Sequence, residues 1–402
     1  MPMKCLALLL AVLCVQLTAH ARDEKSAEPE PSSVHRFVQL AGKVGAKAEV
    51  QVQLQVSPGE DSSSLILGSY QYLSQGKAIF LHGRLENDVL KMEESVFSGA
   101  EEKVSGRFQG RWEGGEDGKH VRISGDWTSG DGQKKLPFTL EEAAVEGSVA
   151  LDFHFFEETY QRKRGDNSFE REQSLLFPQL RDRGEAAGRI NATIRRLALA
   201  CAASSGMGDE EEPKPDLSEK VPSLAAIEAS VRADIPDDKE LADTDFTYSS
   251  SLTYNDEFQV LQDGHGLLCL RLFHTEYTGG AHGNHGAAHI TFDLATGKEV
   301  ALDDLLKPGV KDELTRLAEA ALREEHGLKP DDSLSGEGPL FEDKFELNDN
   351  WFVTPAGLGF SYSPYEIGPY AAGFIEPVIP FAKLKDLLKE GSPLERFGKK
   401  AK

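Results

Sequence analysis

Apolar and polar residues alternate with a period of two through most of residues 37–143, as the stretch AEVQVQLQV (48–56) illustrates. Clusters of Gly, Asp, Asn or Ser interrupt the alternation about every 8 to 12 residues, and no long helical window lies between them. Because every second side chain of a strand faces the same side, this pattern predicts an all-β domain, either a meander or a small barrel. Four aromatic residues at alternate strand positions are expected in its core, with a sugar-stacking face as the alternative: Tyr70, Tyr72, Trp112 and Trp127.

The N-terminal segment is typical of a secretory signal. A basic residue precedes an apolar run from Cys5 to Leu17, and small residues precede a predicted cleavage after Ala21. We therefore predict a signal peptide at residues 1–21 and a flexible tether, rich in Glu, Pro and Ser, at residues 22–36. The apolar run is about half as long as a membrane helix, so no membrane span is expected after signal cleavage, and the mature protein should be periplasmic or secreted.

Residues 145–390 combine strand patterns with helical ones. The stretch VALDFHFFEETYQ (149–161) predicts a strand, and helices are predicted at 184–202, 223–233 and 310–326. Strands grouped with a few helices indicate an α+β domain with a mixed or antiparallel sheet. An acidic loop is expected at 204–222 within this domain, and a C-terminal tail at 391–402.

The charge balance and the missing motifs limit the possible functions. The chain has 44 Lys and Arg against 67 Asp and Glu, a net charge of −23, which argues against a nucleic-acid partner. An acidic surface serves solubility, and it also attracts a cationic protein partner. The sequence has no G-x-S-x-G, P-loop or C-x-x-C motif, and we expect a protein that is not an enzyme.

Signal cleavage would leave two cysteines, Cys201 and Cys269. An even pair in an exported chain is a candidate disulfide, and we predict that the two are joined. Two buried thiols are the alternative. The predicted bond would tie a helix to a strand.

Three histidines, His282, His285 and His289, lie within eight residues and form a candidate metal site. With Asp293 or His274 they could supply the three or four ligands of a zinc ion, and the chain would then be a metal-dependent hydrolase. The pieces HGAAH (285–289) and TFDL (291–294) resemble the metal-binding segments of polysaccharide deacetylases. The second Asp of that pattern is replaced by Leu294, the order of the pieces is reversed, and no β/α barrel is predicted, so we expect no cofactor and keep zinc as the alternative.

Residues 277–282 (YTGGAH) and 363–373 (SPYEIGPYAAG) are the candidate binding segments. Adjacent glycines allow a loop backbone that other residues avoid, while prolines and glycines hold the second segment in a stiff loop. Rigid aromatic and carboxylate groups suit a protein or glycan ligand. The alternative is that the tyrosines of the second segment cover the edge of a sheet and its glutamate accepts backbone hydrogen bonds. The candidate binding residues are Tyr277, Gly279, Gly280, His282, Tyr365, Glu366 and Tyr370.

Residues of about 145–390 resemble the paired extracytoplasmic domains of unknown function found in bacterial envelope proteins. The resemblance rests on YTGGAH, on FDLATGK (292–298) and on SPYEIGPYAAG in combination. Members of that group include the lysozyme-sensing ectodomain of a membrane anti-sigma factor and the accessory domain of a peptidoglycan deacetylase. The signalling and hydrolase roles do not transfer, because the chain shows neither a membrane helix after the signal nor a deacetylase barrel. The resemblance implies an exported, non-enzymatic binding protein that recognises a cationic protein such as lysozyme or a peptidoglycan glycan. A scaffold without a small ligand is a further possibility.

Overall fold

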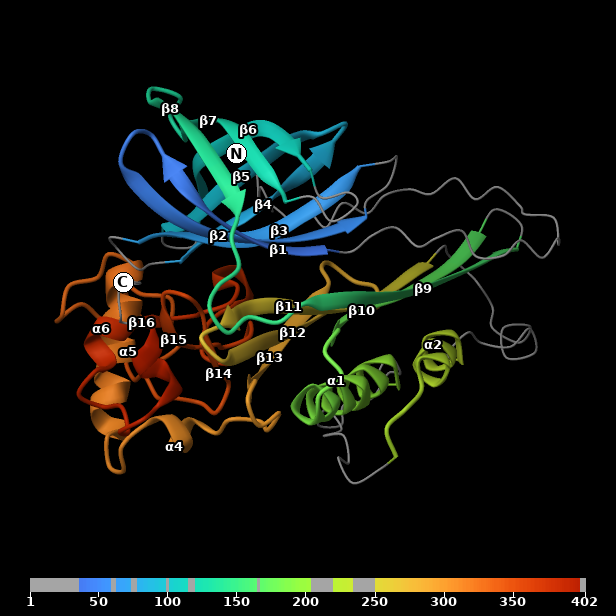
Figure 1. Ribbon diagram of the computed structural model, residues 1–402. Coiled ribbons are helices and arrows are strands. Elements are labelled where there is room, and N and C mark those ends of the chain that lie inside the picture. The colour runs from blue at the N-terminus through green and yellow to red at the C-terminus, as the bar shows by residue number, and fades with distance from the viewer. Residues whose placement is uncertain are drawn as a thin grey trace, which may run out of the picture.

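The computed structural model describes residues 36–58, 63–73, 78–98, 101–114, 120–164, 167–203, 220–233 and 250–397. The predicted signal peptide, nearly all of the predicted tether and most of the acidic loop lie outside these ranges. The described part comprises an N-terminal barrel, a central sheet with two helices, and a C-terminal region (Figure 1).

The N-terminal strands form a closed barrel in which each strand pairs with its neighbours in sequence, and β1 pairs with β8 to close it. All of these pairs are antiparallel, which confirms the predicted all-β domain. The strands are β1 (Arg36–Val44), β2 (Ala48–Pro58), β3 (Ser64–Tyr72), β4 (Ala78–Glu86), β5 (Val89–Ser98), β6 (Glu101–Glu113), β7 (Arg122–Ser129) and β8 (Lys135–Glu142).

The barrel interior is filled by the apolar residues of the alternating pattern. In β2, Val50, Val52, Leu54 and Val56 are buried in this core. Tyr70 and Trp112 belong to the same core, and the other two aromatic residues of the pattern pack against it. The prediction of core aromatics is therefore confirmed.

A second, mixed sheet has five strands in the order β13-β12-β11-β10-β9. Strands β10 and β11 are parallel, and the other neighbouring pairs are antiparallel. The strands are β9 (Leu151–Arg164), β10 (Asn167–Leu180), β11 (Ser250–Gly264), β12 (Leu267–Tyr277) and β13 (Asn284–Asp293). Strand β11 continues from Ser250 to Gly264 without a turn.

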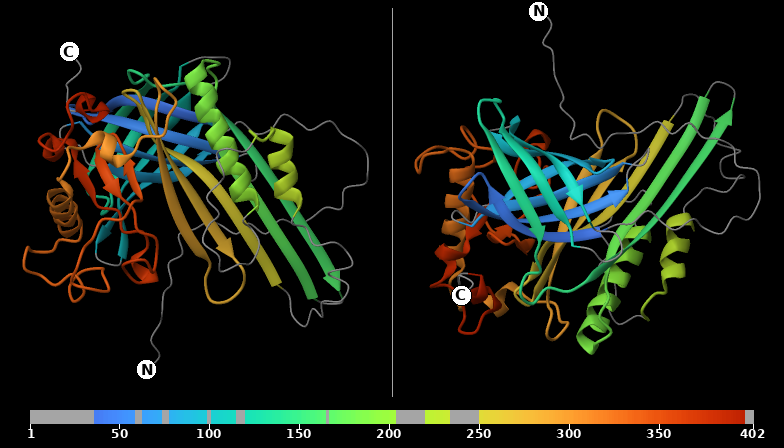
Figure 2. Two further views of the ribbon diagram at one scale, coloured as in Figure 1. Left: turned by 90° about the horizontal axis from the view of Figure 1, so that it is seen from below. Right: turned by 45° about the horizontal axis from the view of Figure 1, so that its top comes forward.

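Helices α1 (Glu185–Ala203) and α2 (Leu224–Ala233) follow β10 in the chain and cover one face of this sheet (Figure 2). Parallel strands need such a crossover, because the chain must return to the same end of the sheet. The apolar face of α1 packs against strand residues such as Phe177, Phe258 and Phe292. Ser223 begins α2 as its sequence suggested, since the Ser223 hydroxyl accepts a hydrogen bond from the Ala226 N–H (3.1 Å).

The C-terminal region has its own core beside the central sheet. The helix α5, which lies within the predicted helical span 310–326, buries Leu314, Leu317, Ala318 and Leu322. A small antiparallel sheet has the order β14-β15-β16. The elements are α4 (Leu302–Leu305), α5 (Lys311–Glu325), β14 (Trp351–Val353), β15 (Gly357–Phe360), η1 (Tyr370–Ala372), β16 (Val378–Pro380), α6 (Phe381–Leu384) and η2 (Pro393–Arg396).

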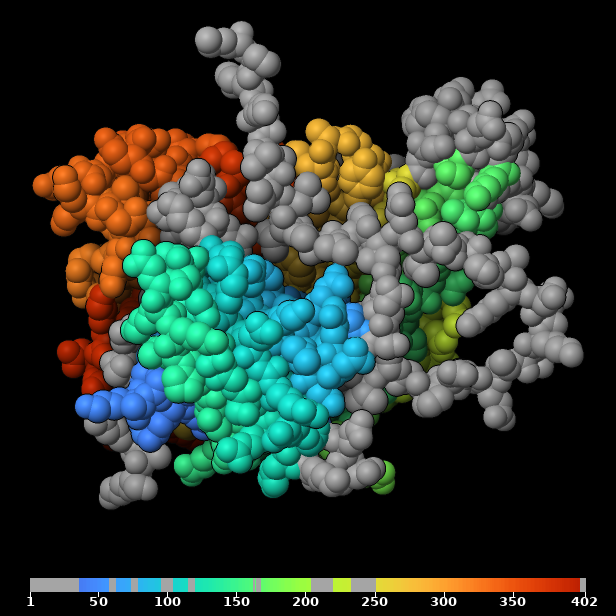
Figure 3. Space-filling model, turned by 90° about the horizontal axis from the view of Figure 1, so that it is seen from above, coloured from blue at the N-terminus to red at the C-terminus, as the bar shows by residue number. Residues whose placement is uncertain are grey.

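The central sheet lies between the barrel on one side and the two helices on the other (Figures 1 and 2). On the face shown in Figure 3, the barrel covers the middle of the molecule, and orange and red C-terminal residues lie beside it. The fold class is thus an eight-stranded antiparallel barrel followed by a region of sheets with a few helices, as predicted. In the described residues, no helix has both the length and the apolar character that a membrane span requires.

The predicted disulfide is wrong, because no bond joins Cys201 to Cys269. Cys201 lies on α1 and packs against the core between helices and sheet. Cys269 lies on β12 and belongs to the C-terminal core, while its neighbours Leu268 and Leu270 face the helices. Successive side chains of a strand point to opposite faces, so Cys269 points away from the layer that holds Cys201.

Two glycines allow barrel strands β6 and β7 to approach closely. Gly110 pairs directly with Gly125, and a Cβ atom on Gly125 would lie 2.1 Å from the Gln109 carbonyl oxygen. We expect Gly125→Ala to lower the free energy of unfolding by about 2 kcal/mol, because overpacking forces the backbone to shift. Urea denaturation followed by tryptophan fluorescence measures this, since Trp112 and Trp127 both lie in the barrel.

Gly188→Ala is the matched control. Gly188 lies on the exposed side of α1, and an added Cβ meets nothing within 4 Å. Alanine is the better helix former, so this change should raise the free energy of unfolding by roughly 0.5 to 1 kcal/mol. Equal effects of the two substitutions would contradict the close-approach explanation.

Candidate functional site

The two candidate segments, far apart in sequence, meet at the end of the β12–β13 hairpin. The hairpin loop passes through Gly279 and Gly280, whose φ angles of 103° and 96° suit glycine. The Gly283 carbonyl oxygen accepts a hydrogen bond from the Tyr370 hydroxyl (2.7 Å) and one from His282 Nδ1 (2.9 Å). A carbonyl oxygen can only accept, so His282 carries its proton on Nδ1. One backbone oxygen thus joins both segments.

Four rings form a continuous surface at this junction, which we call the aromatic surface: His282, His285, Tyr365 and Tyr370. The rings of His282 and Tyr370 are stacked, with centroids 4.0 Å apart and an interplanar angle of 24°. Tyr370 also contacts Tyr365 (5.7 Å) and His285 (5.3 Å). Tyr365 is 57% exposed, so the surface ends in an aromatic side chain open to solvent.

Tyr365 is held in an uncommon backbone conformation, with φ of 71°. This left-handed region is unfavourable for a bulky residue and persists only where neighbouring contacts hold it. The Tyr365 N–H donates to the Gly368 carbonyl (3.0 Å), and the Glu366 carboxylate accepts from the Ser363 N–H (3.0 Å) and from Asn348 (2.9 Å). Glu366 therefore accepts a backbone hydrogen bond, as the alternative interpretation expected, and the same bond keeps the loop that presents Tyr365 rigid.

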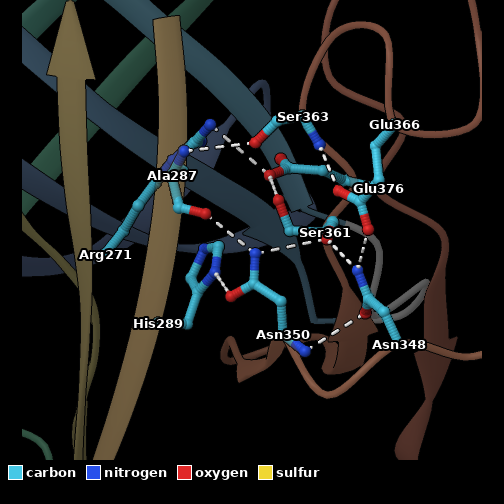
Figure 4. Close-up of polar contacts among 9 residues, drawn as sticks. All are labelled: Arg271, Ala287, His289, Asn348, Asn350, Ser361, Ser363, Glu366 and Glu376. Carbon is cyan, nitrogen blue, oxygen red and sulfur yellow. Dashed lines mark hydrogen bonds and ion pairs between the residues drawn. The ribbon is translucent and has the colours of Figure 1, made fainter. Parts of the chain in front are cut away.

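Asn350 is the centre of the polar network behind this surface (Figure 4). Its Nδ2 donates to the carbonyls of Ala287 (2.8 Å) and Ser361 (3.2 Å), and its Oδ1 lies 2.9 Å from His289 Nδ1. Because Nδ2 faces two carbonyls, the amide can present only its oxygen to His289, which must carry its proton on Nδ1. Asn350 thereby links strand β13 to the C-terminal region.

His289 is held neutral by its surroundings. Its ring stacks on Phe352 at a centroid distance of 4.9 Å, and its Nε2 is buried without a hydrogen-bond partner among the described residues. Burial lowers the pKa of His289 from 6.5 to about 4; the negative charge of Glu376 opposes this shift, and the positive charge of Arg271 adds to it. Burial likewise lowers the pKa of His285.

Arg271 lies beneath the aromatic surface and is only 9% exposed. Its guanidinium carbon is 4.4 Å from the ring centroid of Phe374 and 5.2 Å from that of Phe273. It forms an ion pair with Glu376 (3.4 Å), whose Oε1 also accepts a hydrogen bond from the Ser361 hydroxyl (2.6 Å). A buried cation is thus neutralised by one carboxylate from the C-terminal region.

The candidate zinc ligands do not converge. His282 bonds to Gly283, and His289 bonds to Asn350. His274 Nδ1 lies 2.9 Å from Asp256 instead, while Asp293 accepts two hydrogen bonds from Thr296 in the turn after β13. Within the described ranges, no group of three or more His, Cys, Asp or Glu residues could hold a metal ion. This geometry gives no support to the metal-dependent hydrolase hypothesis.

Of the predicted binding residues, His282, Tyr365 and Tyr370 meet in the aromatic surface, whereas Tyr277 and the two glycines are not part of it. Tyr277 is 36% exposed and its hydroxyl donates to the Gly280 carbonyl of its own loop (3.2 Å). Gly279 and Gly280 shape the same loop. Arg271 and Asn350 were not among the predicted site residues. Arg271 is a charged residue inside the apolar run LLCLRLF (267–273), which was a signal for it, whereas no sequence pattern marked Asn350.

The fold and the site together define a mostly β protein with a barrel, a mixed sheet and an exposed aromatic surface. Residues 303–382 match the family model described as "Protein of unknown function (DUF3298)". This segment contributes Asn350, Tyr365, Tyr370 and Glu376, whereas Arg271 and the histidines precede it.

Two solved structures are similar to the chain. A DUF3298 family member from Bacteroides fragilis has 19% identity and a TM-score of 0.48, with 63% of this chain and 100% of that chain covered. A DUF3298 family protein from Pseudomonas aeruginosa has 20% identity and a TM-score of 0.44, with 62% and 98% covered. No curated protein matches the chain.

The lowered pKa of His289 predicts acid sensitivity. Between pH 6.5 and about 4 the unfolded chain binds a proton at this histidine that the folded chain does not, so stability is retained above pH 6.5 and falls as the pH is lowered. The free energy of unfolding should be about 3 kcal/mol lower near pH 4 than above pH 6.5. His289→Gln should flatten this part of the curve, as measured by urea denaturation at a series of pH values. His282→Gln, which removes an exposed imidazole from the same segment, is the control substitution. A wild-type slope in H289Q would contradict the assignment.

Asn350→Ala should lower the free energy of unfolding by about 3 kcal/mol, because it removes the partner of His289 and of the Ala287 carbonyl and one of the two donors to the Ser361 carbonyl. Asn348→Ala is the matched change, since Asn348 donates to the same Ser361 carbonyl and to the exposed Glu366, and accepts a hydrogen bond from the Asn350 backbone N–H (3.2 Å). Its cost should be about 1 kcal/mol. The reverse order of the two losses in thermal or urea unfolding would show that Asn350 is not the centre of the network.

Proposed function

We propose that the chain is an exported, non-enzymatic binding protein of the cell envelope, whose C-terminal region recognises either a cationic protein such as lysozyme or a peptidoglycan glycan. The observation that carries this proposal is the joining of two distant segments into one exposed aromatic surface. That surface rests on hydrogen bonds that Asn350 donates, on those that Glu366 accepts, and on the Arg271–Glu376 ion pair.

Rigid aromatic side chains are favourable binding groups, because they bury a large area and lose little conformational entropy. Tyr365 combines high exposure with a backbone conformation that its loop holds in advance of binding. Strained residues of this kind cluster at binding sites. The stacked pair of His282 and Tyr370 beside it extends the flat area that a sugar ring or an aliphatic side chain could contact.

The charge around this surface favours a cationic ligand. Residues 330–376, which supply the Tyr365 loop and its framework, contain nine Asp and Glu and one Lys, Lys344. Complementary charge speeds association and selects the partner. Export to the periplasm or the medium, which the N-terminal sequence suggests, would place the surface where lysozyme and peptidoglycan occur.

Calorimetric titration of the full chain with lysozyme and with soluble muropeptides tests the proposal. We expect one class to bind, and Tyr365→Ala to weaken binding about tenfold or more, because an anchoring aromatic is lost. Phe80→Ala is the control: Phe80 is 46% exposed on β4, in the barrel. Binding of a cationic protein should weaken with added salt, whereas binding of an uncharged glycan should not. Absence of heat with both ligand classes would contradict the proposal.

A further inference from the structure

The barrel has two kinds of outer surface. Outward glutamines of β2 are buried against the central sheet, where Gln53 donates to the Leu261 carbonyl of β11 (2.6 Å). Gln55 likewise donates to the Glu257 carboxylate (2.9 Å). Strands β5 and β6 lie on the side of the barrel away from this sheet (Figure 1), and that side is in view in Figure 3. Most of its outward residues are exposed.

The outward residues around the β4–β5 hairpin form one continuous surface. Core residues such as Leu90, Met92 and Phe108 occupy alternate positions of β5 and β6, so the residues between them point outward. Because neighbouring strands are in register, these outward side chains lie in rows across β3, β4, β5 and β6. We call this set the barrel face: Leu65, Leu67, His82, Arg84, Glu86, Val89, Lys91, Glu93, Arg107, Gln109, Arg111 and Glu113.

Three large apolar side chains of the barrel face are exposed. Leu65 is 43% exposed, Leu67 is 37% exposed and Val89 is 39% exposed. The two leucines are two residues apart on β3 and therefore point to the same side of the strand. An exposed apolar area that is rimmed by polar groups marks a site of interaction with another molecule.

The barrel face is nearly neutral, although the chain is strongly acidic. The face has four Arg and Lys and three Glu residues, whereas the whole chain has 44 Lys and Arg against 67 Asp and Glu. Two copies of a chain with a net charge of −23 repel one another where acidic surfaces meet. Two nearly neutral faces avoid this repulsion, so the barrel face suits a second copy of the chain.

Two cations of the barrel face oppose each other. Arg84 and Lys91 are directly opposite in the register of β4 and β5, and like charges at such positions destabilise a sheet. Neither forms an ion pair within the described part of the chain. Glu93 on the same face is bound by Arg107, whose Nε lies 2.7 Å from Glu93 Oε1. A carboxylate from a second molecule would relieve the repulsion between the two cations.

The order of residues on the barrel face is complementary to itself. A two-fold axis that lies between two such faces and runs across the strands places each strand antiparallel to its own copy. With the axis midway between Lys91 and Glu93, the lysine of each copy faces Glu93 of the partner subunit. Leu65 then faces Leu67 of the partner subunit, because the two leucines lie in the same rows as the lysine and the glutamate. A carboxylate has two oxygens and can accept from a second cation besides Arg107.

We infer that the barrel face is an interface between two copies of this chain, related by a two-fold axis at this position. Two equivalent ion pairs and two equivalent leucine contacts join the copies, and the sheets pack face to face. The barrel face is smaller than the roughly 20 to 30 residues of a standard interface, so the dimer should dissociate with a Kd on the order of 10 µM. The interface lies apart from the aromatic surface, and its failure would leave the proposed binding function untouched.

Sedimentation equilibrium of the full chain tests the inference. Protein concentrations of about 1 to 100 µM span the expected Kd, and we expect the mass to rise from that of one chain to that of two. The mass of one chain at every concentration would overturn the inference. A mass above that of two chains would also overturn it, because a two-fold contact closes at the dimer.

An exchange of two charges tests the position of the axis. Lys91→Glu should raise the Kd about tenfold or more, because the new carboxylate would face Glu93 of the partner subunit. The double change Lys91→Glu/Glu93→Lys makes the same contact with the charges exchanged and should return the Kd to within about threefold of the wild-type value. Lys135→Glu is the matched control, since this exposed lysine lies on β8, outside the barrel face, and the Kd should not change. A double variant as weak as K91E would contradict the geometry.

Leu67→Asp tests the apolar part of the interface. It should raise the Kd about tenfold or more, because a carboxylate would lose water against Leu65 of the partner subunit. Phe341→Asp is its control, since Phe341 is 53% exposed but lies in the C-terminal region, and the Kd should stay at the wild-type value. Equal weakening by both changes would assign the effect to added charge alone and overturn the inference. If L67D does not fold, the charge exchange decides the question.

Discussion

Burial of strand β12 on both faces is the constraint on which the arrangement after the barrel depends. Leu268 and Leu270 pack toward helices α1 and α2, while Leu267 and Cys269 pack into the C-terminal core. A strand with two buried faces needs a layer on each side, so the helices and the C-terminal region must both be in place. The same alternation separates the two cysteines into different layers and explains why they do not bond.

On the face of β12 that packs against the C-terminal region, Arg271 follows Cys269. At this residue the buried face changes from apolar to charged. Its guanidinium is enclosed by Phe273 and Phe374 and neutralised by Glu376. A buried charge keeps its partner close, because separation would leave either group unpaired in a medium of low polarity. The loop that carries Phe374 and Glu376 is therefore held against the sheet, and Tyr370 with it. The aromatic surface depends on this attachment as much as on its own stacking.

The barrel is joined to the rest of the molecule in a different way. Each part has a separate apolar core, and glutamine side chains from the barrel donate to carbonyls and a carboxylate of β11. Polar junctions of this kind resemble interfaces between domains more than they resemble cores. The candidate binding surface and the barrel junction use different elements, with Glu257 and Arg271 on neighbouring strands between them.

Hydrophobic periodicity in the sequence was enough to predict the all-β N-terminal domain and the helices near residues 184–202 and 310–326. It also singled out YTGGAH and SPYEIGPYAAG, because glycine and proline restrict the backbone wherever they occur. Periodicity is a local property, so it could not show that Gln53 and Gln55 face another domain, that Cys269 faces away from Cys201, or that Asn350 reaches His289. Those facts depend on which layers cover each face of the central sheet. The sequence by itself determined which residues alternate and where the chain turns; only the tertiary structure decided which of them meet, because contacts between distant segments follow from packing the layers together.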